Sequence, residues 1–218
     1  MAKLLLPIFL MSCFFSFSQE KAPVLPRFSI RGNVGIPKIV SSNAFRNSFS
    51  GVGTADMSVN VKLFSDVFFG IGYSYTYFKT QKYFRDRNIN TALQAQNAYV
   101  RFGYDYFFKD NAFATFSLNS GLNSNKYTNV FYANDSLSTK YPREFTSVFI
   151  EPVVGLYFIV DPNFAIGGHI SYNYNLSQFN PALPGMDKTF NYSSISNRWT
   201  MSMITFGFGF YYGLARKK

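Results

Sequence analysis

Cysteine, histidine and tryptophan are almost absent from this chain of 218 residues, which contains one of each. The single cysteine, Cys13, excludes an intramolecular disulfide and a zinc site built from cysteines. With His169 as the single histidine, the chain has few ligands for a transition-metal centre and one histidine that could serve as a base in serine–histidine catalysis. Charged residues make up only 15% of the chain, and the formal net charge is +10. We therefore expect neither a metal nor any other cofactor.

Long apolar runs are also missing, apart from one at the N-terminus. The stretch MAKLLLPIFLMSCFFSFSQEK has a lysine, an apolar run and then small residues, which is the form of a secretory signal peptide. We predict cleavage after Ser18, so that residues 1–18 are the signal. Alternatively, LMSC resembles a lipoprotein box that would put a lipid on Cys13. No other stretch reaches the roughly 18 apolar residues of a membrane-spanning helix.

Aromatic residues, by contrast, are abundant, at 20% of the chain. In TFGFGFYYG (Thr205–Gly213), large apolar side chains alternate with small residues, and alternate residues of a strand point to opposite faces. The same pattern recurs in seven other segments, so eight strands are predicted. These seven segments are 27–36, 52–64, 67–78, 97–106, 114–123, 147–158 and 164–176.

The links between these segments alternate strictly between short and long. SD, FKDN and DPN are tight-turn sequences, whereas 37–51, 79–91, 124–145 and 178–198 are long. This pattern is typical of an outer-membrane barrel. We predict an all-β fold: an eight-stranded antiparallel up-and-down transmembrane β-barrel over residues 27–213, with short periplasmic turns and four long extracellular loops. Residues 19–26 and the basic tail 214–218 would place both termini in the periplasm.

Alternation alone also fits a soluble lipocalin-like barrel, whose apolar face points inward. In this chain the small face carries the charges and most strand glycines, which suits a narrow eight-stranded interior. Aromatic residues such as Phe64, Phe164 and Tyr174 lie near strand ends, as in interfacial girdles. The large apolar face is therefore predicted to contact lipid. Pro152 on that face predicts a β-bulge or a distorted register, because proline donates no ladder hydrogen bond.

With these features the chain resembles the porin-like outer-membrane β-barrel family of Bacteroidota, a group of small eight-stranded barrels. The resemblance covers about Arg27 to Gly213 and depends on the architecture, the SFSQ style of signal cleavage and the aromatic final strand. The tail LARKK departs from it, because such chains often end on an aromatic residue. The resemblance implies a fold and a location in the bacterial outer membrane, and it does not specify an activity.

Seven charged or titratable residues fall on the inward face of the predicted strands. An unpaired charge in a tight interior is costly, so we expect them to form a polar network across the lumen. The alternative is a selective pore lined by charge. The residues are Arg31, Asp56, Lys62, Arg101, Asp105, Glu151 and His169.

One pattern raises the possibility of an enzyme. His169-Ile170-Ser171 resembles the histidine–serine pair of lipid A deacylases, which are also eight-stranded barrels. In those enzymes the histidine would be the base and the serine the nucleophile. Here no glutamate follows in the last strand or its loop, and both side chains are predicted to face inward. We therefore assign no catalytic residue and keep the hydrolase as an alternative hypothesis.

Positive charge is concentrated in the long links. KTQKYFRDR contributes a basic loop surface of Lys79, Lys82, Arg85 and Arg87. In this compartment the abundant polyanion is lipopolysaccharide, so the predicted partners are outer-membrane lipid and lipopolysaccharide, and not nucleic acid. The leading hypothesis is a non-enzymatic surface protein that serves membrane integrity, adhesion or lipopolysaccharide contact. A second hypothesis is an accessory subunit of a larger outer-membrane complex.

Overall fold

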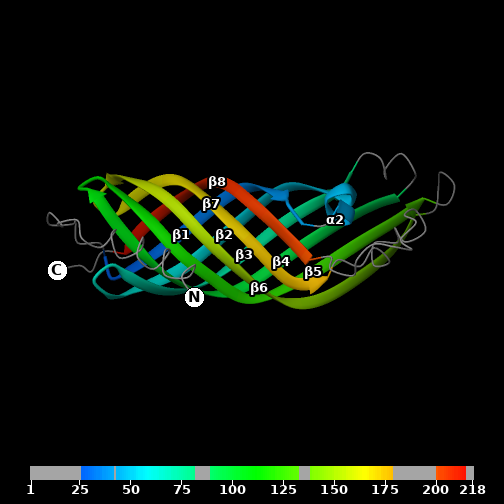
Figure 1. Cartoon of the computed structure of the whole chain (residues 1–218), viewed down its shortest axis with the longest axis horizontal. Helices are drawn as coiled ribbons and strands as arrows, with labels where there is room; N and C mark the ends of the chain where they lie inside the picture. Colours follow the sequence, from blue (N-terminus) through cyan, green and yellow to red (C-terminus); the bar gives the residue numbers. More distant parts are fainter. Residues whose placement is uncertain (1–25, 42, 82–88, 133–137, 179–199, 215–218) are drawn as a thin grey trace, which may run out of the picture.

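The computed structural model describes residues 26–41, 43–81, 89–132, 138–178 and 200–214. This part of the chain forms eight strands and one short helix (Figure 1). The elements are β1 (Phe28–Ile39), α2 (Asn43–Ser48), β2 (Phe49–Phe64), β3 (Val67–Thr80), β4 (Ile89–Lys109), β5 (Ala112–Tyr132), β6 (Ser138–Asp161), β7 (Phe164–Gln178) and β8 (Thr200–Leu214). The predicted signal peptide and Cys13 lie outside the described residues.

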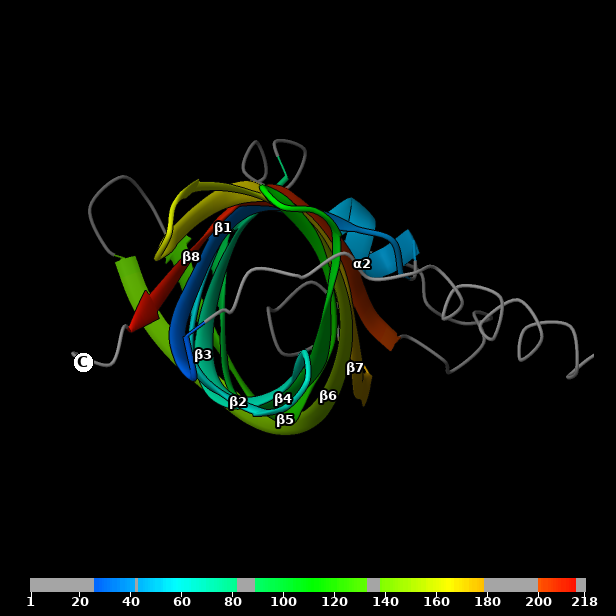
Figure 2. The same cartoon turned by 90° about the vertical axis from the view of Figure 1, so that its left-hand side faces the viewer.

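The strands form a closed barrel in sequence order. Each strand pairs antiparallel with the next, and β1 closes the ring on β8, from Phe28 opposite Leu214 to Ile39 opposite Met203. Figure 2 shows this ring end-on. Closure leaves no sheet edge inside the barrel wall, so every strand there has a partner on both sides. The predicted eight-stranded antiparallel up-and-down barrel is confirmed.

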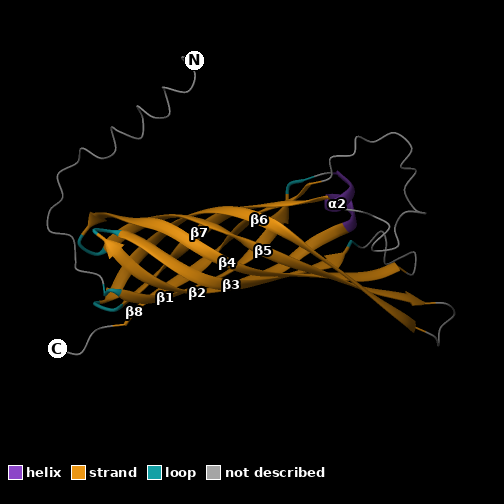
Figure 3. Cartoon of the chain, turned by 90° about the horizontal axis from the view of Figure 1, so that it is seen from below, coloured by secondary structure: helices purple, strands orange, loops and turns teal. Residues whose placement is uncertain are grey.

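The two ends of the barrel differ. At one end, the short turns Ser65–Asp66, Asp110–Asn111 and Pro162–Asn163 join consecutive strands, and Pro26 and Leu214 lie at the same end. The helix α2 and the strand ends that the long links join lie at the other end (Figures 1 and 3). We call these the turn end and the loop end. This arrangement follows from the alternation of short and long links.

The predicted link 124–145 is wrong in extent, because most of it is strand. β5 continues to Tyr132 and β6 already begins at Ser138. A strand needs about 9–11 residues to cross a membrane, so strands of 21 and 24 residues continue beyond it. Outward positions in this extension, such as Ser124 and Lys126, are polar. Because the outward positions of the extension are polar, its sequence lacks the apolar alternation that predicts a strand, and the pattern indicates a loop instead.

The prediction of a bulge or a distorted register at Pro152 is also wrong. Pro152 stays in register with Leu118 of β5. On its other side the pairs Ile150–Tyr174 and Val153–Ser171 have the same register, and only the two positions between them are unpaired. The missing proline N–H is therefore accommodated by a short gap in the β6–β7 ladder, without an extra residue.

The two faces of the wall have the predicted orientation. Phe206 is 52% exposed on the outside, whereas its neighbour on the inner phase, Thr205, is 3% exposed. Large apolar side chains are exposed along the outer face of every strand. A continuous apolar exterior of this kind fits contact with hydrocarbon rather than water. Among the described residues, no helix is long and apolar enough to cross a membrane.

Candidate functional site

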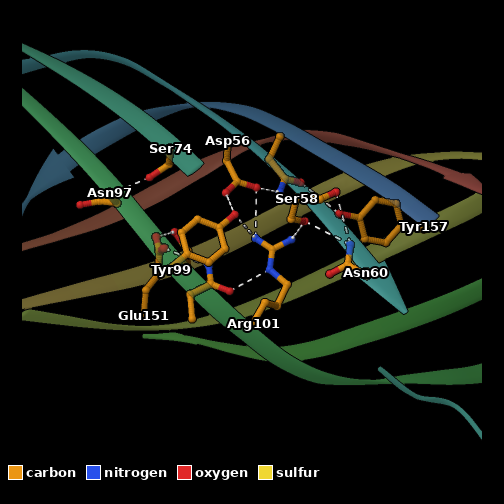
Figure 4. Close-up of polar contacts among 12 residues, drawn as sticks. Asp56, Ser58, Asn60, Ser74, Asn97, Tyr99, Arg101, Glu151 and Tyr157 are labelled. Carbon is orange, nitrogen blue, oxygen red and sulfur yellow. Dashed lines mark hydrogen bonds and ion pairs between the residues drawn. The ribbon is translucent and has the colours of Figure 1, made fainter. Parts of the chain in front are cut away.

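Arg101 of β4 is the centre of a polar network in the middle of the lumen. Its guanidinium donates to Asp56 Oδ1 of β2 at 3.1 Å and to Ser58 Oγ at 2.7 Å. Its Nε donates to Asn119 Oδ1 of β5 at 2.8 Å. Figure 4 shows these contacts converging from several strands. Because these partners accept from all three nitrogens of a buried guanidinium and one of them is a carboxylate, the charge is compensated where water is largely excluded.

Tyr99 adds a hydrogen bond to this network that sequence reasoning did not assign. Its hydroxyl donates to Asp56 Oδ2 and accepts from Arg101 Nη2 at 3.0 Å. The ring lies over Gly72, its partner on β3, where a Cβ would overlap the tyrosine ring. In the sequence, Gly72 and Tyr99 are both on the inward phase of their strands. Their contact can be inferred only when the register between β3 and β4 is known.

Glu151 and Ser171 meet in the same layer. Glu151 accepts from Ser171 Oγ at 2.8 Å and from Asn119 Nδ2 at 3.1 Å. His169 is buried nearby, and its Nδ1 has no hydrogen-bond partner among the described residues. Ser171 therefore bonds to a carboxylate and not to His169, so this geometry does not provide the nucleophile–base pair of a hydrolase.

The space around these groups is small. The cavity that His169, Ser171, Glu151 and Asp56 line has a volume of about 20 Å³. That is room for about one water molecule, and not for an acyl chain or a sugar. Within the described residues, no group of three or more histidine, cysteine or acidic side chains could hold a metal ion.

A second charged layer closes the turn end of the lumen. Arg31 of β1 donates to both carboxylate oxygens of Asp105 on β4, at 3.1 and 2.7 Å. Thr115 donates to Asp105 Oδ1 at 2.7 Å, and the Arg31 guanidinium lies 3.9 Å from the ring centroid of Phe68. Phe113 also stacks on Tyr157 at 5.3 Å beside this pair. Packed rings and a paired charge thus fill the lumen here.

Lys62 does not join either network. Its Nζ donates to Asp66 of the first turn at 2.9 Å, within the same β-hairpin. The seven predicted lumen residues therefore separate into the Arg101 network with Asp56 and Glu151, the pair Arg31–Asp105, the pair Lys62–Asp66, and His169 without a partner at Nδ1.

An apolar plug fills the loop end of the lumen, and sequence reasoning missed it. Phe45 of α2 is 2% exposed and packs its ring against Phe49 and Phe78, at 5.8 Å from each. Other inward side chains continue the cluster: Ile39, Leu93, Ala95, Tyr127, Met201 and Met203. Most of these positions lie beyond the ends of the predicted strands. The plug closes the loop end of the lumen and the Arg31–Asp105 layer closes the turn end, so the described residues leave no open pore.

Exposed charges are distributed unequally between the two rims. At the loop end, Lys38, Arg46, Lys79 and Arg143 are exposed, and Glu144 pairs with Lys126 at 2.7 Å. At the turn end, Arg27 and Lys109 are balanced by Asp110 and Asp161. Among described side chains, cations thus exceed anions only at the loop end. Of the predicted basic loop surface, Lys79 lies here, whereas Lys82, Arg85 and Arg87 lie outside the described residues.

These features define a small transmembrane β-barrel with a closed, polar lumen. No family model matches the sequence, and no curated protein matches it. Neisserial surface protein A has a similar structure, with 16% identity over 88% of this chain and 99% of its own, at a TM-score of 0.51. More distant are the attachment invasion locus protein Ail of Yersinia pestis (12% identity, 87% of this chain and 100% of its own, TM-score 0.45) and OprG of Pseudomonas aeruginosa (8%, 90% and 100%, 0.45).

The likeness to Neisserial surface protein A concerns the fold. This chain therefore has the fold of the small eight-stranded outer-membrane barrels. The narrower assignment to the porin-like family of Bacteroidota stays a prediction, because no family model matches.

Proposed function

We propose that this protein is an integral outer-membrane barrel that contacts lipopolysaccharide through its cationic loop end, without chemical turnover. In this orientation the turn end, where β1 begins and β8 ends, faces the periplasm. The loop end reaches the outer leaflet, where phosphate groups of lipopolysaccharide are concentrated.

The charge difference between the two rims supports this function and this orientation. Lys38, Lys79 and Arg143 are exposed at the loop end, whereas the charges described at the turn end balance. Anionic surfaces attract such a rim by summed Coulomb interactions. A barrel oriented the other way would direct its excess positive charge away from the polyanion of the outer leaflet.

The closed lumen supports a surface role rather than transport. The Phe45 plug and the Arg31–Asp105 layer fill the two ends, and the cavity between them has room for about one water. What extends from the barrel is a three-stranded projection of β4, β5 and β6, whose ladders continue to the pairs Ile89–Phe131 and Tyr132–Ser138 (Figure 3). Its exposed Arg143 adds to the cationic rim.

The test is lipopolysaccharide binding by the barrel in lipid nanodiscs, with a variant in which Lys82, Arg85, Arg87 and Arg143 become glutamine. Counterion release makes polyanion binding salt-dependent, so this variant should bind more weakly and with a smaller salt dependence. A control variant in which Arg27 and Lys109 at the turn end become glutamine should bind lipopolysaccharide as the wild type does. Equal binding by both variants would contradict the proposal.

Orientation has a separate test. If cleavage removes Cys13, the mature barrel contains no cysteine, so single cysteines can be introduced at Thr128 and Ser65. A membrane-impermeant maleimide added to whole cells should label Thr128→Cys and leave Ser65→Cys unlabelled until the cells are broken. The reverse pattern would place the turn end outside.

A further inference from the structure

The outer wall has a groove where β6, β7, β8 and β1 run side by side. Its volume is about 520 Å³, far larger than the lumen cavity. The side chains around it are apolar, and they come from all four strands. They include Val34, Phe158, Ile166, Phe208 and Phe210.

The groove exists because of an outward-facing glycine. Gly168 lies between Leu156 of β6 and Phe208 of β8, both of which project outward. A Cβ added to Gly168 would meet only the Gly207 carbonyl oxygen, at 3.6 Å, which is an ordinary contact. Packing therefore does not require glycine here, and a larger side chain would simply fill the recess. Phe208, at 77% exposure, forms one side of it.

The position of the groove indicates its occupant. It lies in the apolar wall, so hydrocarbon is the medium that reaches it, and its apolar lining offers little to a polar ligand. A recess bounded by exposed aromatic rings suits a single flexible acyl chain, which can be immobilised there with favourable dispersion contacts.

Two lysines lie on the outer face near the loop end, one on β1 at the side of the groove and one on β3, two strands away. Lys38 is on the same face of β1 as Val34, four residues closer to the loop end, or about 13 Å at 3.3 Å per residue. Lys79 is exposed on β3 opposite Ser50 of β2, so only β2 lies between the two lysine-bearing strands. Within the described residues no carboxylate pairs with either lysine. A lipid whose phosphate lies near Lys38 would have its acyl chain directed along β1 toward the groove.

We propose that the wall binds one phosphorylated membrane lipid, with an acyl chain in the groove at Gly168 and the phosphate near Lys38 and Lys79. This site depends on the proposed function for its orientation, since the lysines must lie at the surface of the outer leaflet. It goes further in assigning a defined lipid site to the wall, which shares Lys38 and Lys79 with the cationic rim and adds the groove at Gly168.

The experiment is native mass spectrometry of the full barrel in a non-ionic detergent, titrated with dimyristoyl phosphatidylglycerol. The wild type should retain one lipid saturably, and dimyristoylglycerol, which lacks the phosphate, should bind much less. Gly168→Leu fills the groove and Lys38→Gln removes a charge. Each should weaken binding about tenfold, because Gly168→Leu removes the apolar contacts of the acyl chain and Lys38→Gln removes a charged contact with the phosphate.

Matched controls separate the site from general effects of substitution. Ala98→Leu enlarges a small outward residue on β4, away from the groove, and Lys109→Gln removes an exposed cation at the turn end. Both should bind lipid as the wild type does. Folding of every variant is checked by the heat-dependent gel mobility of the barrel.

Several results would overturn the lipid site. These are unchanged binding in both Gly168→Leu and Lys38→Gln, retention of many lipids without saturation, equal binding of dimyristoylglycerol, or a protein subunit occupying the wall instead. Failure of the proposed function is distinguishable, because its glutamine variant leaves Gly168, Lys38 and Lys79 unchanged. That variant can lose lipopolysaccharide binding while the lipid site stays intact, and the reverse holds for Gly168→Leu.

Discussion

Arg31 and Asp105 form a two-pronged ion pair across the lumen, from strands that are not neighbours in the barrel. The nitrogen and oxygen of the closer contact are 2.7 Å apart, and the two side chains are 3% and 5% exposed. A bidentate arginine–carboxylate pair fixes the relative position of both groups. The pair therefore ties β1 to β4 through the interior, whereas backbone hydrogen bonds connect only adjacent strands.

Removing one partner of this pair should destabilise the barrel strongly. Asp105→Asn leaves the Arg31 charge buried without its counterion, which costs about 3–5 kcal/mol. Urea unfolding in lipid vesicles, followed by circular dichroism, measures the change. Arg31→Met combined with Asp105→Leu should recover much of the loss, because no lone charge remains. Glu144→Ala, which breaks the exposed pair with Lys126, should change stability by only about 0–1 kcal/mol.

The Tyr99 hydroxyl should contribute measurably to stability through Asp56. Tyr99→Phe removes a hydrogen bond to a buried carboxylate, and we expect a loss of about 1.5–3 kcal/mol in the same unfolding experiment. Tyr73→Phe is the control, because Tyr73 is half exposed on the outer face of β3. If both variants unfold at the wild-type urea concentration, the Asp56 contact does not hold the network together.

A charge on the outer wall should be costly in proportion to its depth in the membrane. Phe208 is in the central part of β8, whereas Phe64 ends β2 beside the first turn. Phe208→Arg should lose about 2–4 kcal/mol and Phe64→Arg about 0–1 kcal/mol. Folding yield and urea unfolding in vesicles compare the two. A water-facing outer wall would instead tolerate arginine equally at both positions.

Opening the loop-end plug alone should not create a channel. Phe45→Ala removes a ring from the apolar cluster and should destabilise it by up to about 3–5 kcal/mol. The turn-end layer of Arg31, Phe68 and Phe113 still closes the lumen, so planar-bilayer recordings should show no added conductance. Steady conductance steps in Phe45→Ala would mean that α2 is the only barrier.

The sequence by itself determined the number of strands, their antiparallel order and the faces that they present. These properties are local, because side chains alternate along a strand and the length of each link indicates whether it is a turn. Phe206, Phe208 and Phe210 could therefore be assigned to the outside, and Arg31, Arg101 and His169 to the inside, without knowing the neighbours of any strand. The limits of strand prediction appeared where the outward residues became polar, as at Ser124 and Lys126.

Only the tertiary structure decided which inward residues meet. Pairing across the lumen depends on the stagger of the strands around the ring, which no single segment encodes. Because of that stagger, Arg31 forms an ion pair with Asp105 and Lys62 forms one with Asp66. Ser171 donates a hydrogen bond to Glu151 and not to His169. The Phe45 plug and the groove at Gly168 have the same origin, since each is formed by side chains from several strands. Strand identity is a local property of this chain, whereas the contents of its lumen and the recess in its wall are set by closure of the whole barrel.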